Sequence, residues 1–216
     1  MADIKINYFD FGLYRGTELR WVTEDIFPRL NIKNYKAYGF EACGKYADGL
    51  SRHFINNEKV DIINRAIGDH RGTIKLYYSA NSVGHSIFDT KNNVDKNKYE
   101  IVESIKFSDW VLENVGDFKT SFNILKVNIE GAEWHLFNDL CNSGLNKYIH
   151  IFCGQGHDVD KIGELEEKVQ DYYKLIEDNN IKLYRFTEWK PHKNDSIERI
   201  IKEQVVEFCK KNYENL

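Results

Sequence analysis

The chain has 216 residues and a formal net charge of −4, with acidic and basic side chains mixed along its length. This length suits one domain with a sizeable core, and the charge gives no overall reason to expect nucleic acid or an anionic membrane as a partner. No stretch approaches the roughly 20 apolar residues of a membrane span, and four cysteines without a Cys-x-x-Cys pair argue against a zinc site or a disulfide scaffold. We therefore expect a single cytoplasmic domain over residues 1–216, without a metal.

Apolar runs alternate with amphipathic helical patterns from one end of the chain to the other. The first half predicts a strand at 4–11, a helix at 17–30, a strand at 35–41, a helix at 44–54 and strands at 59–67 and 72–79. Residues 80–104 are polar and Asn-rich, which predicts a long mobile loop. The second half predicts a helix at 107–116, a strand at 122–129, a helix at 133–144, a strand at 147–154, a helix at 160–179, a strand at 181–189 and a helix from about Ser196. This alternation indicates an α/β fold, a three-layer sandwich with a mostly parallel, doubly wound sheet.

In such a fold, ligands bind beyond the carboxyl ends of the strands. Five segments should therefore lie along one edge of the sheet: 10–16, 41–44, 67–72, 128–133 and 153–158. The first contains Gly12 and Gly16 in a Gly-x-x-x-Gly turn, which suits either a nucleotide site or an ordinary turn. The second begins with Glu41, whose carboxylate can accept both hydroxyls of a ribose or can simply cap the next helix.

The third and fourth segments carry small and polar residues. Ala66 and Gly68 leave room for a flat base, and Asp69 can accept a hydrogen bond from the exocyclic amine of that base. Asp-x-x-Gly is also a common turn. Lys126, Asn128 and Glu130 share one face of a predicted strand, because side chains alternate along it. They form either a site or a buried Lys–Glu pair, with Glu133 favouring the start of the next helix.

Together these stretches resemble the FkbM family of S-adenosylmethionine-dependent methyltransferases. The resemblance runs in order from Asp10 to about Leu140. It rests on four blocks: "FDFGLYRG", "YGFEA", "NRAIGDHRGTIKLY" and "ILKVNIEGAEWHLF", of which the last is the most specific. Two positions depart from the family pattern, since Asn128 replaces an aspartate and Ala42 replaces a proline.

The resemblance implies a class I, Rossmann-like methyltransferase fold with S-adenosylmethionine as cofactor. It implies a role for Glu41 at the ribose, and the other expected cofactor-binding residues are Asp10, Gly12, Arg15 and Gly16 toward the methionine end, Ala66, Ile67, Gly68 and Asp69 beside the adenine, and Ala42 and Asn128. The acceptor it implies is a hydroxyl on a small molecule or glycan, with the 80–104 loop on the acceptor side.

Transfer to a hydroxyl requires a group that takes its proton. His157 is the preferred base, and His85 and Glu130 are rivals; each histidine can also be purely structural. Two other functions stay open. One is a methyltransferase-like domain that has lost activity and acts by binding, which Asn128 favours; the other is a nicotinamide-dependent oxidoreductase, against which the Gly-x-x-x-Gly spacing counts.

Overall fold

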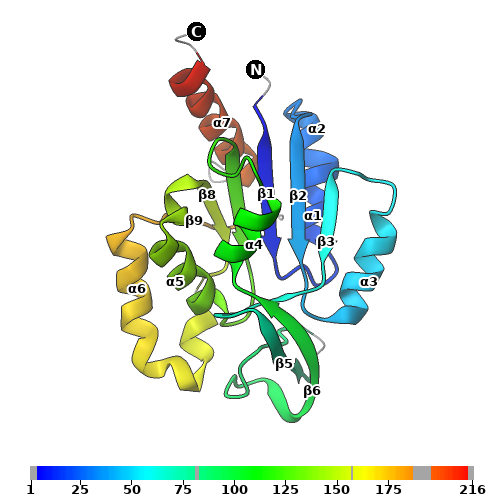
Figure 1. The fold of residues 1–216 in the computed structure, drawn as a ribbon, viewed down its shortest axis with the longest axis vertical. Helices are drawn as coiled ribbons and strands as arrows, with labels where there is room; N and C mark the ends of the chain where they lie inside the picture. Colours follow the sequence, from blue (N-terminus) through cyan, green and yellow to red (C-terminus); the bar gives the residue numbers. More distant parts are fainter. Residues whose placement is uncertain (1–3, 81–82, 157, 187–195, 214–216) are drawn as a thin grey trace.

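A six-stranded sheet forms the centre of the protein in the computed structural model, which describes residues 4–80, 83–156, 158–186 and 196–213 (Figure 1). In sheet order its strands are β3 (Val60–Ile63), β2 (Tyr35–Phe40), β1 (Ile6–Phe11), β7 (Phe122–Val127), β8 (Ile149–Gly154) and β9 (Leu183–Tyr184). Every neighbouring pair is parallel. All residues of β1 and β7 are buried, as expected for the middle of a parallel sheet covered on both faces.

Helices cover the two faces of this sheet and give each face its own core. One face carries α4 (Phe107–Asn114), α5 (Glu133–Ser143) and α6 (Val169–Asp178), whose apolar side chains pack on Phe9 and Phe11 of β1. The other carries α1 (Thr17–Arg20), α2 (Phe27–Arg29), α3 (Gly44–His53) and α7 (Ile197–Tyr213), which pack around Tyr8. The expected three-layer, doubly wound α/β sandwich is therefore confirmed.

A second, three-stranded sheet lies below the carboxyl ends of the central strands in Figure 1. It consists of β4 (Ala66–Ile67), β6 (Val94–Ile105) and β5 (Gly72–Ser79), with β6 in the middle, parallel to β4 and antiparallel to β5. The prediction of a loop over 80–104 is wrong for its second half. Residues 94–105 form β6, which is the longest strand among the described residues. Half of the residues of β6 are exposed and only Val102, Ser104 and Ile105 are buried, so it lacks the continuous apolar run that identifies a buried strand.

The strand predicted at 59–67 is split between the two sheets. β3 ends at Ile63, and the Asn64 side chain donates hydrogen bonds to the carbonyls of Glu41 (2.8 Å) and Ala42 (3.0 Å). These bonds fasten the chain to the end of β2 as it leaves the central sheet. Residues 66–67 then enter the second sheet as β4.

Two predicted helices are less regular than their apolar stripes indicate. Residues 17–29 are helical, but Trp21–Ile26 form π-helical turns before Pro28, which has no N–H to bond the carbonyl four residues back. Residues 160–179 begin as 3₁₀ turns, Asp158–Lys161 and Gly163–Lys168, and become α-helical only at Val169. Between those turns Ile162 is extended and bridges to Lys91, which prevents one continuous helix.

The remaining predicted elements agree with the structure to within a few residues. A further 3₁₀ turn, Leu145–Tyr148, precedes β8. The final predicted strand, 181–189, is represented by β9 alone, and residues 187–195 lie outside the described residues. In the described part of the chain, no helix combines the length and the apolar character needed to cross a bilayer.

Candidate functional site

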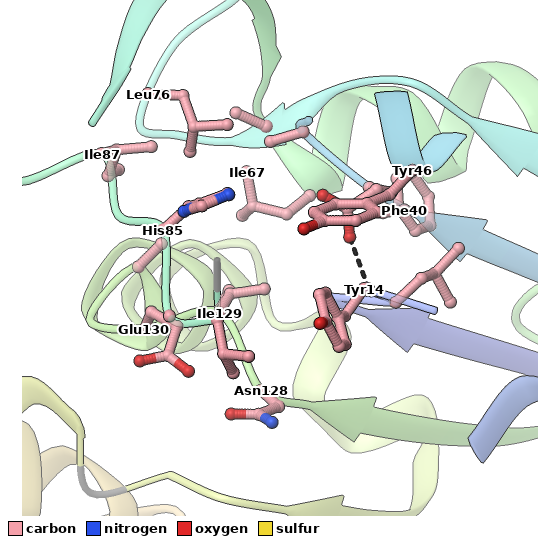
Figure 2. Close-up of a pocket in the computed structure, with 18 of the residues that line it drawn as sticks. Tyr14, Phe40, Tyr46, Ile67, Leu76, His85, Ile87, Asn128, Ile129 and Glu130 are labelled. Carbon is pink, nitrogen blue, oxygen red and sulfur yellow. Dashed lines mark hydrogen bonds between the residues drawn. The ribbon is translucent and has the colours of Figure 1, made fainter. Parts of the chain in front are cut away.

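A cavity of about 510 Å³ opens where the carboxyl ends of β1, β2 and β7 face the second sheet (Figure 2). This volume falls within the roughly 300–1,000 Å³ of sites for small ligands. The central sheet and its loops contribute Gly12, Leu13, Tyr14, Thr17, Glu18, Phe40, Glu41, Ala42, Tyr46, Asn128, Ile129, Glu130 and Ala132, and the second sheet and its connections contribute Arg65, Ala66, Ile67, Leu76, Val83, Gly84, His85 and Ile87. The cavity therefore lies at strand ends, as the sequence rule predicts, but segment 67–72 contributes only Ile67 to its lining and the described residues of 153–158 contribute none.

The turn after β1 brings three strand ends together. Gly12 has a φ of +81°, and a Cβ at this position would lie 1.8 Å from the carbonyl oxygen of Asn128. The Gly12 N–H donates to the Phe40 carbonyl (3.0 Å), and the Asn128 N–H donates to the Phe11 carbonyl (2.9 Å). Gly12 lines the cavity, whereas Gly16 packs on Leu50 of α3 and does not.

Glu41 is held at the cavity wall by two main-chain hydrogen bonds. Its Oε2 accepts from the Tyr14 N–H (2.7 Å, dashed in Figure 2), and its Oε1 accepts from the Cys43 N–H (2.8 Å). Burial raises the pKa of the Glu41 carboxyl, and the two N–H groups oppose that shift. Each carboxylate oxygen keeps acceptor capacity, so the anchored group can still receive hydroxyl donors from a ligand.

Asp10 lies beneath the cavity and does not line it. It is fully buried, its Oδ1 lies 2.9 Å from Lys126 Nζ, and its Oδ2 accepts a hydrogen bond from the Tyr8 hydroxyl (3.1 Å). Lys126 also donates to the Gly12 carbonyl (3.1 Å). The polar strand face at 126–130 is therefore divided: Lys126 pairs with Asp10 in the interior, and neither Glu130 nor Glu133 is its partner.

The expected adenine-side residues separate into two groups. Ala66 and Ile67 line the cavity beside Ala42, but Gly68 and Asp69 do not. The Asp69 carboxylate is largely exposed and lies 2.6 Å from Nδ1 of His70, a hydrogen bond that lowers its pKa.

At the other end of the cavity, Asn128 lines the wall and Arg15 does not. The Arg15 guanidinium is exposed and stacks over the Tyr14 ring at 5.3 Å. The Asn128 Oδ1 is buried and has no hydrogen-bond partner among the described residues. An amide oxygen in this state is an acceptor available to a ligand.

His85 lines the cavity as a hydrogen-bond donor. Its Nδ1 accepts the Ser79 main-chain N–H (3.0 Å), so the neutral ring carries its proton on Nε2. Burial lowers the pKa of His85 and favours this neutral form. The ring therefore has no free lone pair, and the geometry disfavours His85 as a base.

Glu130 follows β7 with a φ of +57°, an uncommon conformation for a residue with a side chain. Its Oε2 lies 2.6 Å from Nζ of Lys91, a residue that is 5% exposed. His157, the preferred base from the sequence, lies outside the described residues. Its neighbour Asp158 is buried and pairs with Lys161.

Several wall residues were missed by the sequence reasoning. Tyr14 and Tyr46 meet edge to face at 4.8 Å, and the Tyr46 ring stacks over His85 at 6.1 Å. Leu76 of β5 and Ile87 of the connection between β5 and β6 add apolar surface (Figure 2). Tyr14 occupies a variable position of the Gly-x-x-x-Gly turn, and Tyr46 fits the apolar stripe of the helix predicted at 44–54. Leu76 lies in the strand predicted at 72–79 and Ile87 in the region predicted as a loop, and no pattern marked either one as a cavity residue.

The wall chemistry fits S-adenosylmethionine. Phe40, Ile67 and Leu76 offer apolar surface to a flat heterocycle, Glu41 offers acceptors to ribose hydroxyls, and the buried Asn128 Oδ1 offers one to an ammonium group. Among the described residues no three His, Cys, Asp or Glu side chains are grouped to hold a metal ion.

The parallel strand order, the glycine turn and the cavity at the strand ends define a Rossmann-like α/β protein of the methyltransferase type. The family model described as the methyltransferase FkbM domain matches residues 10–176, so the chain belongs to the FkbM methyltransferase family. The four sequence blocks indicated the same family. Searches of curated proteins and of solved structures returned no match.

Proposed function

We propose that the protein transfers the methyl group of S-adenosylmethionine to a hydroxyl oxygen of a small molecule or glycan. The observation that carries this proposal is Glu41: its carboxylate is fixed by the N–H groups of Tyr14 and Cys43 at the wall of a cavity of about 510 Å³. Membership of the methyltransferase family supports methyl transfer and counts against a nicotinamide-dependent oxidoreductase.

In this proposal the cavity has a cofactor half and an acceptor half. Glu41 binds the ribose hydroxyls, Ala66 and Ile67 border the adenine, and Asn128 receives the ammonium of the methionine moiety. Asp10 acts indirectly, since its ion pair with Lys126 supports the Gly12 turn. Gly84, His85 and Glu130 border the acceptor.

S-adenosylmethionine supplies an electrophilic methyl group when bound. The chain's own task is to align the acceptor hydroxyl with that methyl group and to receive the hydroxyl proton. Glu130 is the described residue suited to receive it, because it lines the cavity and its contact with Lys91 is made through Oε2, which leaves Oε1 to face a ligand. His85 donates from Nε2 to another oxygen of the acceptor.

Calorimetry with S-adenosylmethionine, S-adenosylhomocysteine and NAD tests the cofactor. We expect the first two to bind in the micromolar range and NAD not to bind. The absence of any heat signal with the first two would overturn the proposal.

A panel of hydroxylated acceptors, read by formation of S-adenosylhomocysteine, tests the reaction. Binding without turnover on every acceptor would favour a second function, a domain that binds the cofactor and acts by interaction. One observation favours that alternative: Asn128 occupies the family's aspartate position, and an amide cannot act as a base.

A further inference from the structure

Lys91 has no role in the site as described so far, yet its ammonium group is buried beside the cavity wall. Nζ lies 2.6 Å from Glu130 Oε2 and donates to the Gly84 carbonyl (2.8 Å). The Lys91 side chain is 4% exposed and Glu130 is 21% exposed. Burying an ammonium group is costly unless it is paired, so this ion pair is a built feature and not a surface contact.

The chain conformation around the pair fits it closely. Gly84 has a φ of +83°, and a Cβ there would lie 2.9 Å from Lys91 Nζ and 3.2 Å from Glu130 Oε2. The positive φ disfavours any residue with a side chain here, and an added Cβ would also displace the Lys91 ammonium group. The backbone of Lys91 is itself fixed, because it bridges to Ile162.

Glu130 is held at its main chain as well as at its carboxylate. The Ser86 hydroxyl donates to the Glu130 carbonyl (2.7 Å), and the residue keeps its left-handed backbone. In Figure 2 Glu130 lies on the cavity wall with His85 above it and Asn128 next to it. Ser86 and Lys91, from the one segment 84–91, therefore fix the main chain and the carboxylate of Glu130. Its left-handed backbone is strained, and such strain is typical of functional positions.

We propose that Lys91 is a positioning residue for methyl transfer: its ammonium group balances the charge of Glu130, holds Oε2 and aims the other oxygen, Oε1, at the acceptor hydroxyl. This role rests on the proposed function. In the step it serves, the acceptor oxygen forms a bond to the methyl carbon as the carbon–sulfur bond breaks and its electron pair goes to sulfur. The hydroxyl proton passes to Glu130 Oε1 and then to solvent.

The two forms of the cofactor provide a test that needs no acceptor. S-adenosylmethionine carries a positive sulfonium centre, whereas S-adenosylhomocysteine has a neutral sulfur. If the Lys91–Glu130 pair borders the transferred methyl group, removing one charge of the pair will change the affinity for the first ligand relative to the second. A pair with only a structural role will not change this ratio.

Calorimetry with both ligands should therefore be run on the wild type, Lys91→Met, Lys91→Arg and Glu130→Gln. In Lys91→Met the unbalanced carboxylate should favour the sulfonium at least threefold over the wild-type ratio. In Glu130→Gln the unbalanced ammonium should disfavour it at least threefold. Lys91→Arg keeps the charge and should stay within twofold, as should the control Lys98→Met, which removes an exposed lysine paired with Asp95.

The outcomes separate the two proposals. Unchanged ratios in Lys91→Met and Glu130→Gln would overturn the role of Lys91 and leave the proposed function standing. A wild-type protein that binds neither ligand would overturn both. If Lys91→Met does not fold, Glu130→Gln decides alone, because its predicted shift has the opposite sign and its amide can keep a hydrogen bond to Lys91.

Discussion

Asp10 and Lys126 face each other across β1 and β7, in register, with Oδ1 and Nζ 2.9 Å apart and both side chains at most 2% exposed. Lys126 also donates to the Gly12 carbonyl, so the pair supports the turn that lines the cavity from beneath. Burial raises the pKa of Asp10 to about 6 even though the Lys126 ammonium opposes the shift. The carboxylate therefore depends on its partner.

Lys126→Met should destabilise the protein strongly, because it leaves a buried carboxylate without its partner. Breaking a buried pair in this way costs about 3–5 kcal/mol. Urea unfolding measures the loss. Lys36→Met is the control: it removes a lysine whose side chain is 25% exposed and which pairs with the exposed Asp61 at 2.8 Å, and it should cost about 1 kcal/mol. Equal losses in the two variants would contradict the buried-pair interpretation.

Gly12→Ala should disrupt the turn after β1. The new Cβ would overlap the Asn128 carbonyl oxygen, and the φ of +81° disfavours any side chain. We expect a loss of about 3 kcal/mol or more in the unfolding free energy, together with loss of S-adenosylhomocysteine binding. Gly116→Ala is the control, since its Cβ would meet nothing within 4 Å; a similar loss in both variants would count against this account of the turn.

Glu41→Gln should weaken the binding of S-adenosylhomocysteine by about 1–3 kcal/mol, since an amide oxygen replaces a carboxylate that accepts ribose hydroxyls. The amide also places an NH₂ group against the N–H of Tyr14 or Cys43. Calorimetry gives the affinity, and thermal unfolding shows whether the variant is folded. Glu18→Gln changes another carboxylate of the same wall and should have a smaller effect. Equal affinities of Glu41→Gln and the wild type would refute the ribose assignment.

Glu133 should make stability depend on pH. It is fully buried and receives the N–H groups of Ile129 (2.8 Å) and Gly131 (2.6 Å), and burial raises its pKa from 4.5 to about 7. The folded state then binds this proton more tightly than the unfolded state, so the unfolding free energy contributed by Glu133 falls as the pH rises from about 4.5 to 7. A shift of this size corresponds to about 3 kcal/mol.

Denaturation of the wild type and of Glu133→Gln at several pH values between 4.5 and 8 measures this contribution. The variant should be less stable at pH 5, because one N–H of the 129–131 loop loses its acceptor, but its pH dependence should be flatter. Parallel curves for the two proteins would show that Glu133 does not titrate in this range.

His85 should remain a neutral ring with its proton on Nε2 at pH 6.5, because Nδ1 accepts the Ser79 N–H and burial lowers its pKa. Long-range ¹H–¹⁵N spectra distinguish the two ring nitrogens, and the His85→Gln variant assigns the signals. The exposed His53, which pairs with Glu24, provides the comparison within the same spectrum. A neutral ring with its proton on Nδ1 would leave the lone pair of Nε2 free, and His85 would again be a candidate base.

The middle of the central sheet could be predicted from the sequence because β1 and β7 are buried on both faces and read as apolar runs. β6 could not, since only Val102, Ser104 and Ile105 at its end are buried and its other residues meet solvent. Residues 59–67 were predicted as one strand because their apolar pattern is continuous. The pattern does not show that the Asn64 side chain bonds to the end of β2 and that the chain then enters another sheet.

The residues of the candidate site that follow a strand end could be predicted from the sequence. The residues whose position depends on a partner distant in the sequence could not. Glu41 follows from the position of a strand end. By contrast, an alternating strand pattern does not reveal that Lys126 points inward to Asp10 while Glu130 reaches the cavity. Lys91 stands in a polar stretch and resembles any solvated lysine until the fold brings Glu130 against it.

The two walls of the cavity come from separate parts of the chain. Ile67, Leu76, His85 and Ile87 come from one continuous segment, residues 66–105, whereas Gly12, Glu41 and Asn128 come from the ends of the central strands. That segment leaves the central sheet after β3 and returns at α4 without interrupting any pairing of the central strands. The segment is therefore an insertion that builds one wall of the cavity on its own. Under the proposed function, a change in it would alter the surface beside the adenine, through Ala66 and Ile67, as well as the acceptor side, through His85.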